Sequence, residues 1–208
     1  MGDRDGLILD YGGVLTSSPF ASFETFCATE RLAPQTVRAL FRDDRQARAL
    51  LAGLETGAMP ATEFEAALAP LLGVGPERLL QRMFGGMSRD AAMLDGVRAI
   101  HARGIRLGLL SNSVGDAAVY DLALRDELFD AWVISSEVGL RKPDPAIYAL
   151  AAERLGLAPA ACVYVDDIGG NLKPARALGM ATVLHRGDAE ATLAAVNRLL
   201  RQRDGNTD

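Results

Sequence analysis

The sequence predicts an α/β fold, in which a Rossmann-like, doubly wound parallel sheet carries an inserted helical-bundle cap. Short apolar runs without polar alternation recur along the chain, which is typical of parallel strands buried on both faces. The later runs alternate with segments of helical spacing, as in right-handed crossovers between parallel strands. A long helical interval after the first run breaks this alternation and indicates the insertion.

Five apolar runs are the expected strands of the sheet. Each is short, and turn or helix signals bound it on both sides. They are LILD (7–10), LGLLS (107–111), WVIS (132–135), CVYVD (162–166) and ATVL (181–184).

Helical spacing with clear stop and start residues marks the expected core helices. Gly104 and Gly156 each follow such a segment, and Pro145 opens one at a position that suits proline. The expected core helices are 89–103, 145–155, 171–178 and 188–202.

The interval after the first run is too long for one crossover helix, since roughly ninety residues separate the first two runs. Most of it has helical spacing, with glycine and proline between the segments. We therefore expect a core domain of residues 1–16 and 88–208 and a helical cap domain of residues 17–87. Phe20, Phe23 and Phe26 step at helical spacing and are expected in the core of the cap. The expected cap helices are 20–31, 35–52, 61–72 and 76–84.

The composition excludes several classes of partner. The chain has 208 residues, 49% of them hydrophobic, and a formal net charge of −5, whereas nucleic-acid binding requires a basic face. No window approaches the roughly 18 apolar residues that span a bilayer, and no secretion signal opens the chain. Cys27 and Cys162 lack a CxxC spacing. These features predict a cytoplasmic protein without membrane or nucleic-acid partners.

Charged and polar side chains follow the expected strands at their carboxyl ends, where open α/β sheets bind ligands. Asp10 ends the first strand, and Asp166 and Asp167 end the fourth. Such carboxylates repel one another unless a cation lies between them, and hard oxygen donors suit Mg²⁺. Lys142 and Ser111 are expected to bind a phosphoryl group, which leaves Asp10 as a nucleophile that forms an aspartyl-phosphate.

These motifs together resemble those of the haloacid dehalogenase-like hydrolase superfamily over nearly the whole chain. LDYGGVLT, LLSNS, GLRKPDP and YVDDIGGN match its four motifs in order, on Asp10, Ser111, Lys142 and the pair Asp166–Asp167. The helical interval resembles the small cap of the branch that includes phosphatases (subfamily I). The resemblance implies a Mg²⁺-dependent phosphatase that acts on a small phosphorylated metabolite, such as a sugar phosphate.

Gly12 departs from the family pattern, in which a second Asp serves as the general acid and base. The resemblance implies that the backbone carbonyl of Gly12 still binds the metal. A missing acid costs about 10²–10⁴-fold in rate, so we expect leaving groups that need little protonation. Gly13 suits a tight turn and a close backbone approach to phosphate. Asn112 is expected to bind phosphate, and Asn171 is either a helix cap or a support of the site.

Two alternative functions stay open at this stage. The first is a haloacid dehalogenase, which uses an Asp nucleophile without a metal; the pair Asp166–Asp167 argues against it because dehalogenases of the family lack such a pair. The second is a weakly active binding or regulatory protein that kept the fold after the loss of the carboxylate at position 12.

Overall fold

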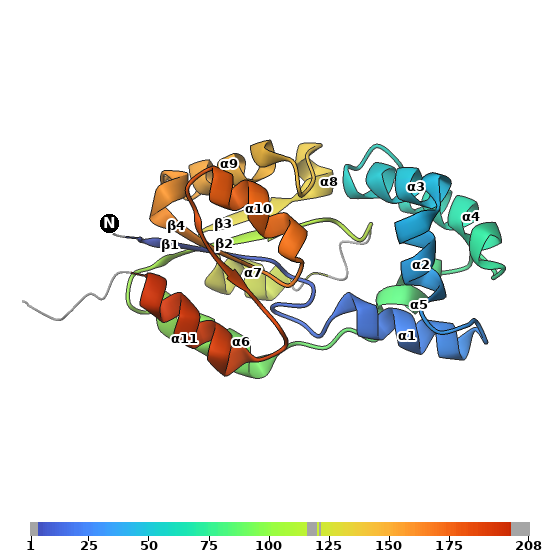
Figure 1. Cartoon of the computed structure of the whole chain (residues 1–208), viewed down its shortest axis with the longest axis horizontal. Helices are drawn as coiled ribbons and strands as arrows, with labels where there is room; N and C mark the ends of the chain where they lie inside the picture. The colour runs from blue at the N-terminus through green and yellow to red at the C-terminus, as the bar shows by residue number, and fades with distance from the viewer. Residues whose placement is uncertain (1–3, 116–119, 121, 201–208) are drawn as a thin grey trace, which may run out of the picture.

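The sheet has five parallel strands in the order β3-β2-β1-β4-β5 (Figure 1). The computed structural model describes residues 4–115, 120 and 122–200. Every predicted strand is present within one residue of its expected bounds, which confirms the α/β prediction. The strands are β1 (Gly6–Leu9), β2 (Arg106–Ser111), β3 (Ala131–Ile134), β4 (Cys162–Asp166) and β5 (Ala181–Leu184).

The strand register places the carboxyl ends of three strands side by side. Leu9 of β1 pairs with Leu109 of β2 and with Val165 of β4. The backbone N–H of Asp10 then donates to the carbonyl of Val165 at 3.0 Å. Asp10 therefore stands directly beside the end of β4.

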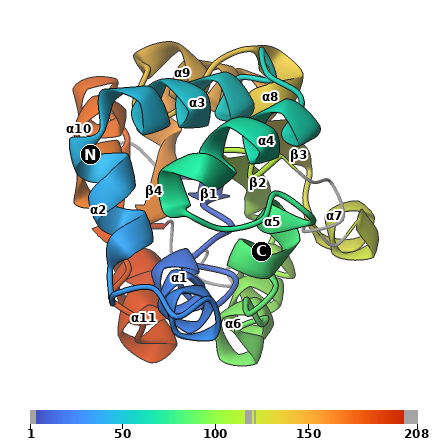
Figure 2. The ribbon, with the colours of Figure 1, turned by 90° about the vertical axis from the view of Figure 1, so that its right-hand side faces the viewer.

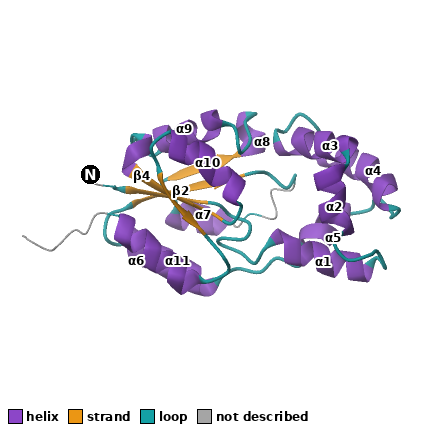
Figure 3. Ribbon diagram, viewed as in Figure 1, coloured by secondary structure: helices purple, strands orange, loops and turns teal. Residues whose placement is uncertain are grey.

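Helices cover both faces of the sheet (Figures 1 and 3). Leu7 and Leu9 pack on the side of α6, α7 and α11, whereas Ile8 packs on the side of α9 and α10. This alternation follows from the two-residue period of a strand. The sequence did not predict α7 or α8. The bounds are α6 (Ala91–His101), α7 (Leu122–Leu128), α8 (Ser135–Val138), α9 (Pro145–Arg154), η2 (Pro159–Ala161), α10 (Gly169–Ala177) and α11 (Ala189–Leu199).

Five helices lie beyond the carboxyl ends of the strands and pack around an apolar cluster of their own (Figure 2). The single helix expected over 35–52 is wrong. Asp44 has an extended backbone (φ −87°, ψ 127°) and its side chain caps the next helix by accepting from the N–H of Ala47 at 2.7 Å. The helices are α1 (Pro19–Thr29), α2 (Thr36–Asp43), α3 (Arg45–Glu55), α4 (Ala61–Leu72) and α5 (Leu79–Phe84).

The two chain crossings into and out of this helical insertion run side by side. Thr16 forms an antiparallel bridge with Arg89, and the N–H of Ser17 donates to the carbonyl of Ser88 at 2.7 Å. The insertion is thus joined to the sheet layer through one paired connection. Among the described helices, none is long and apolar enough to cross a membrane.

Candidate active site

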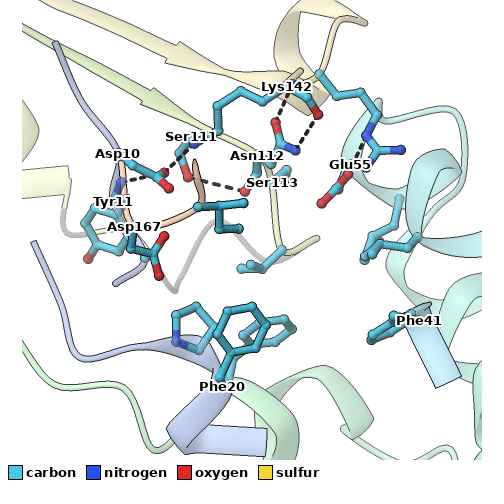
Figure 4. Close-up of a pocket in the computed structure, with 18 of the residues that line it drawn as sticks. Asp10, Tyr11, Phe20, Phe41, Glu55, Ser111, Asn112, Ser113, Lys142 and Asp167 are labelled. Carbon is cyan, nitrogen blue, oxygen red and sulfur yellow. Dashed lines mark hydrogen bonds and ion pairs between the residues drawn. The ribbon is translucent and has the colours of Figure 1, made fainter. Parts of the chain in front are cut away.

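Lys142 occupies the centre of a buried group of charges at the carboxyl edge of the sheet. Its Nζ lies 2.8 Å from Oδ1 of Asp10 (Figure 4). The same nitrogen lies 2.9 Å from Oδ2 of Asp166. The Lys142 side chain is only 2% exposed and that of Asp166 is fully buried. Although burial opposes the charged form, the two carboxylates raise the pKa of Lys142, so the lysine stays protonated. The structure brings these three predicted residues together.

Asp166 accepts hydrogen bonds from several groups besides Lys142. The backbone N–H of Ile168 donates to Oδ1 at 2.7 Å, and the amide of Asn171 donates to both oxygens at 3.1 Å. The Tyr164 hydroxyl also donates to Oδ2. Burial raises the pKa of Tyr164 well above its ordinary value, so the hydroxyl remains a donor. These bonds fix Asp166 as the carboxylate that orients Lys142, and they place Asn171 in support of the site.

The three carboxylates form a set that fits a small divalent cation. Ligand oxygens of Asp10, Asp166 and Asp167 lie within 4.8 Å of one another. Burial raises the pKa of Asp10 to about 8, although Lys142 opposes this, and burial together with Asp166 raises the pKa of Asp167 to about 6. The single lysine therefore does not balance the negative charge. Hard carboxylate oxygens with unbalanced charge are the donor set that Mg²⁺ takes in proteins.

The two glycines after Asp10 have different reasons to be glycine. Gly13 has φ +78°, and a Cβ there would collide with the carboxylate of Asp167. Gly12 has no such backbone constraint: an added Cβ would meet Pro19 at 3.0 Å and Met87 at 3.6 Å. Gly13 therefore makes room for Asp167, whereas a side chain at position 12 needs only a small shift of its neighbours.

Ser111 ends β2 beside the charged group and Asn112 follows it, but the two side chains make different contacts. Ser111 Oγ lies 3.0 Å from the hydroxyl of Tyr120. The Asn112 amide accepts from the N–H of Lys142 at 2.8 Å and donates to its carbonyl at 3.2 Å. Asn112 thus holds the backbone of the lysine loop, and its phosphate-binding role stays a prediction. Neither side chain caps a described helix.

Tyr164 and Tyr120 are site residues that the sequence analysis missed. Tyr164 lies inside an apolar strand run, where its hydroxyl two residues before Asp166 was a usable signal because both side chains face the same side of the strand. No local pattern singles out Tyr120. Its hydroxyl contacts Ser111 only because tertiary packing places Tyr120 beside the end of β2.

A cavity of about 490 Å³ extends from Asp10 toward the helical insertion. The insertion contributes a set of aromatic side chains, here named the phenylalanine wall: Phe20, Phe23, Phe41, Phe64 and Phe84. Figure 4 shows Phe20 and Phe41 across the cavity from Ser111 and Asp10. Phe23 and Phe26 are buried in the insertion, as the sequence predicts, but Phe23 also faces the cavity.

Glu55 at the end of α3 connects the insertion to the lysine loop. Its Oε2 lies 2.6 Å from Nε of Arg141, the residue before Lys142. The backbone carbonyl of Glu55 also accepts from the hydroxyl of Ser135 in α8. Burial raises the pKa of Glu55, although Arg141 opposes this. The cavity is therefore bordered by a direct contact between the two parts of the fold.

Comparisons with known proteins agree with this architecture. The family model for haloacid dehalogenase-like hydrolase matches residues 5–179. Phosphatase MT3486 of Mycobacterium tuberculosis is 29% identical over 192 residues, which cover 86% of this chain and 85% of the relative. Bifunctional epoxide hydrolase 2 of Rattus norvegicus is 31% identical over 119 residues. That match covers 54% of this chain and 22% of the relative, so the chain spans less than a quarter of its length.

A solved structure shares the fold across nearly the whole chain. It is a haloacid dehalogenase family enzyme of Bacteroides thetaiotaomicron in complex with magnesium and inorganic phosphate. The TM-score is 0.64 at 20% identity, and the match covers 90% of this chain and 96% of that one. The fold agrees with this neighbour, and the family model accounts for most of the sequence. The protein therefore belongs to the haloacid dehalogenase-like hydrolases and is a hydrolase.

Proposed function

We propose that the protein is a Mg²⁺-dependent phosphatase that hydrolyses a small phosphate monoester through an aspartyl-phosphate on Asp10. The observation that carries this proposal is the group of Asp10, Asp166 and Asp167 around Lys142 at one edge of the sheet. A phosphatase relative over 86% of the chain supports the same chemistry. The helical insertion, which we propose to be a cap domain of residues 17–87, covers this edge of the sheet.

Each residue of the group has a role in the proposed reaction. Asp10 attacks phosphorus and forms the aspartyl-phosphate, which water then hydrolyses. Lys142 and Ser111 bind the phosphoryl oxygens, as does the backbone N–H of Gly13 in the turn that follows Asp10. Asp166 holds Lys142 toward Asp10 through the hydrogen bonds described above.

The metal site in this proposal consists of Asp10, Asp167, Asp166 and the backbone carbonyl of Gly12. Asp166 already accepts hydrogen bonds from four groups. Its contribution to the metal site is therefore mainly its negative charge and its hydrogen bond with Lys142. A bound Mg²⁺ neutralises charge on the phosphoryl group and on the nucleophile.

Hydrolysis of p-nitrophenyl phosphate tests the proposal directly. We expect turnover with Mg²⁺, loss of turnover with EDTA, and recovery when Mg²⁺ is added back. Asp10→Asn should lower kcat by at least about 10³-fold, since it removes the nucleophile. The exposed Asp95→Asn on α6 is the matched control and should keep wild-type activity. Turnover that survives Asp10→Asn contradicts the proposal.

Acid quenching during turnover tests the intermediate separately. With [³²P]-labelled acetyl phosphate, label should stay on the chain and map to the peptide containing Asp10, and alkali should release it. Absence of label from a chain that turns over under these conditions contradicts the aspartyl-phosphate.

The missing carboxylate at position 12 supports a preference among phosphate esters. An ester whose leaving oxygen needs little protonation reacts without the general acid. The anomeric oxygen of glucose 1-phosphate needs less protonation than the primary oxygen of glucose 6-phosphate, so the 1-phosphate should react faster of the two. An equal or reversed preference contradicts this part of the proposal.

A haloacid dehalogenase remains the competing enzyme function. The pair Asp166–Asp167 supports phosphate chemistry, because a dehalogenase needs no cation at that position. Chloride release from 2-chloropropionate in the presence of EDTA would overturn the phosphatase proposal. A weakly active binding protein is the other rival, and turnover that depends on Asp10 argues against it.

A further inference from the structure

The wall of the cavity that faces Asp10 is apolar and aromatic. Phe20, Phe23 and Phe41 line it, and Met83 and Met87 fill the space beside them. Phe41 and Phe20 lie across the cavity from Asp10 and Ser111 in Figure 4. In an ester held at Asp10, the alcohol part lies on the side away from the nucleophile. The phenylalanine wall is therefore the surface that the leaving group meets.

The rings of this wall hold one another in place. The centroids of Phe23 and Phe84 are 5.2 Å apart with an interplanar angle of 68°, and those of Phe20 and Phe23 are 6.2 Å apart at 75°. Edge-to-face pairs of this kind are favourable arrangements for aromatic rings. The guanidinium of Arg38 covers the Phe20 ring at 4.3 Å from its centroid. The wall is thus formed before a ligand binds.

Such a wall does not suit a leaving group rich in hydroxyls. A sugar hydroxyl that is buried against phenylalanine loses its hydrogen bonds to water without replacement. Among the described residues of the insertion that line the cavity, the charged ones are Arg38, Arg42 and Glu55. Glu55 is engaged by Arg141, and Arg42 pairs with its neighbour Asp43 at an exposed position.

Position 12 adds an independent constraint on the same leaving group. Gly12 lines the same cavity as Asp10 and the phenylalanine wall, and it offers no side chain to protonate the departing oxygen. A phenolic oxygen leaves readily as its anion because a phenol has a pKa of about 10. An aromatic ring also matches an aromatic wall in shape and in its weak need for hydrogen bonds.

We propose that the substrate is an aryl phosphate monoester whose ring packs against Phe20, Phe23 and Phe41; this inference rests on the proposed phosphatase function. Asp10 forms a bond to phosphorus while the bond from phosphorus to the phenolic oxygen breaks, and that oxygen leaves with the electron pair. Water then bonds to phosphorus, and the carboxylate of Asp10 departs with its electron pair. The proton of the water passes to solvent or to the phenolate, so the products are a phenol and inorganic phosphate.

Three substrates separate this inference from the proposed function. All three are assayed with Mg²⁺ and the full chain. 2-Naphthyl phosphate has an aryl leaving group, and glucose 1-phosphate has a polar one. The leaving group of acetyl phosphate is small and needs neither contact with the phenylalanine wall nor protonation by a general acid. We expect kcat/KM for 2-naphthyl phosphate to exceed that for glucose 1-phosphate by at least about tenfold, since burial of one ring contributes that much. Turnover of acetyl phosphate with no such excess overturns the aryl substrate and leaves the phosphatase intact. Turnover of none of the three overturns both.

A pair of matched variants tests the wall itself. Phe41→Gln should lower the ratio of kcat/KM for 2-naphthyl phosphate to that for acetyl phosphate by at least about tenfold. Phe129→Gln makes the same change at another partly buried phenylalanine, which packs on Trp132 away from the cavity, and should leave this ratio unchanged. The ratio does not depend on how much of each variant is folded. An unchanged ratio in Phe41→Gln, or an equal fall in both variants, overturns the inference.

Discussion

Nζ of Lys142 lies 2.8 Å from Oδ1 of Asp10, so the candidate nucleophile and the buried lysine form one ion pair. The pair has a third member, since Asp166 lies 2.9 Å from the same nitrogen. A buried charge that loses its partner is costly, because the interior solvates it poorly. Both the stability and the chemistry of the site therefore depend on this lysine.

Lys142→Met should destabilise the fold by about 3 kcal/mol, since it leaves the carboxylates of Asp10 and Asp166 without their buried partner. It should also lower kcat by at least about 10²-fold, because a phosphate-binding charge is lost. Urea unfolding and p-nitrophenyl phosphate turnover measure the two effects. Lys173→Met, at the chain's other lysine, which is exposed on α10, is the control. Wild-type stability in Lys142→Met would contradict the ion-pair argument.

Gly12→Asp should increase turnover of esters with poor leaving groups. A carboxyl group there supplies the missing acid, and the backbone of Gly12 accepts a side chain with a small shift of Pro19. We expect kcat for hexyl phosphate to rise by up to about 10²-fold and that for acetyl phosphate to change little. In contrast, Gly13→Ala should lower kcat for both hexyl phosphate and acetyl phosphate, because the added Cβ collides with Asp167. An equal effect of Gly12→Asp on both esters would rule out an acid role.

Glu55 and Arg141 should act together on substrate binding. Their contact joins the insertion to the lysine loop, so its loss should loosen the border of the cavity and raise KM by about threefold. The measurement is a double-mutant cycle with Glu55→Gln, Arg141→Ala and the double variant. We expect the KM of the double variant to equal the KM of each single variant. Arg98→Ala on α6 is the control, and fully additive effects would show that the pair is not coupled.

Mg²⁺ should stabilise the folded protein through Asp167. An ion that binds only the folded state adds about 2.7 kcal/mol when its concentration is 100 times Kd. Thermal unfolding with and without 10 mM MgCl₂ measures the gain as a rise in Tm. Asp167→Asn should abolish most of this rise, whereas Asp188→Asn at the start of α11 should keep it. An equal rise in both variants would place the ion elsewhere.

His185 should make the fold sensitive to mild acid. Its ring Nδ1 lies 2.9 Å from the hydroxyl of Thr192, and burial lowers its pKa although Asp90 and Asp188 oppose the shift. The unfolded chain then takes up a proton at higher pH than the folded one does. Stability is therefore complete above about pH 6.5 and falls as the pH drops toward the lower folded pKa.

Urea unfolding at pH 7.5 and 5.5 tests the direction of this pH dependence. The loss of unfolding free energy between the two pH values should be smaller in His185→Gln than in the wild type. His101→Gln, at the chain's other histidine on α6, is the matched control. A larger loss in His185→Gln than in the wild type would reverse the assignment.

The sequence by itself determined the strands and the residues that end them. A run such as CVYVD is apolar on both faces, so only a buried strand satisfies it, and Asp166 must then stand at its end. Parallel strands share one carboxyl edge, and Asp10, Asp166 and Lys142 each come at or after the end of an apolar run. The sequence therefore predicted that these three residues meet at that edge. The break at Asp44 was harder to predict, since helical spacing continues through it.

Only the tertiary structure decided which distant residues meet. The contact of Tyr120 with Ser111 and the facing of Phe41 toward Asp10 both join segments whose local patterns carry no sign of one another. A local pattern fixes the period and the buried face of an element. How whole elements pack against one another decides which elements become neighbours. That packing determined which residues form the phenylalanine wall and which residues pair with the charged side chains.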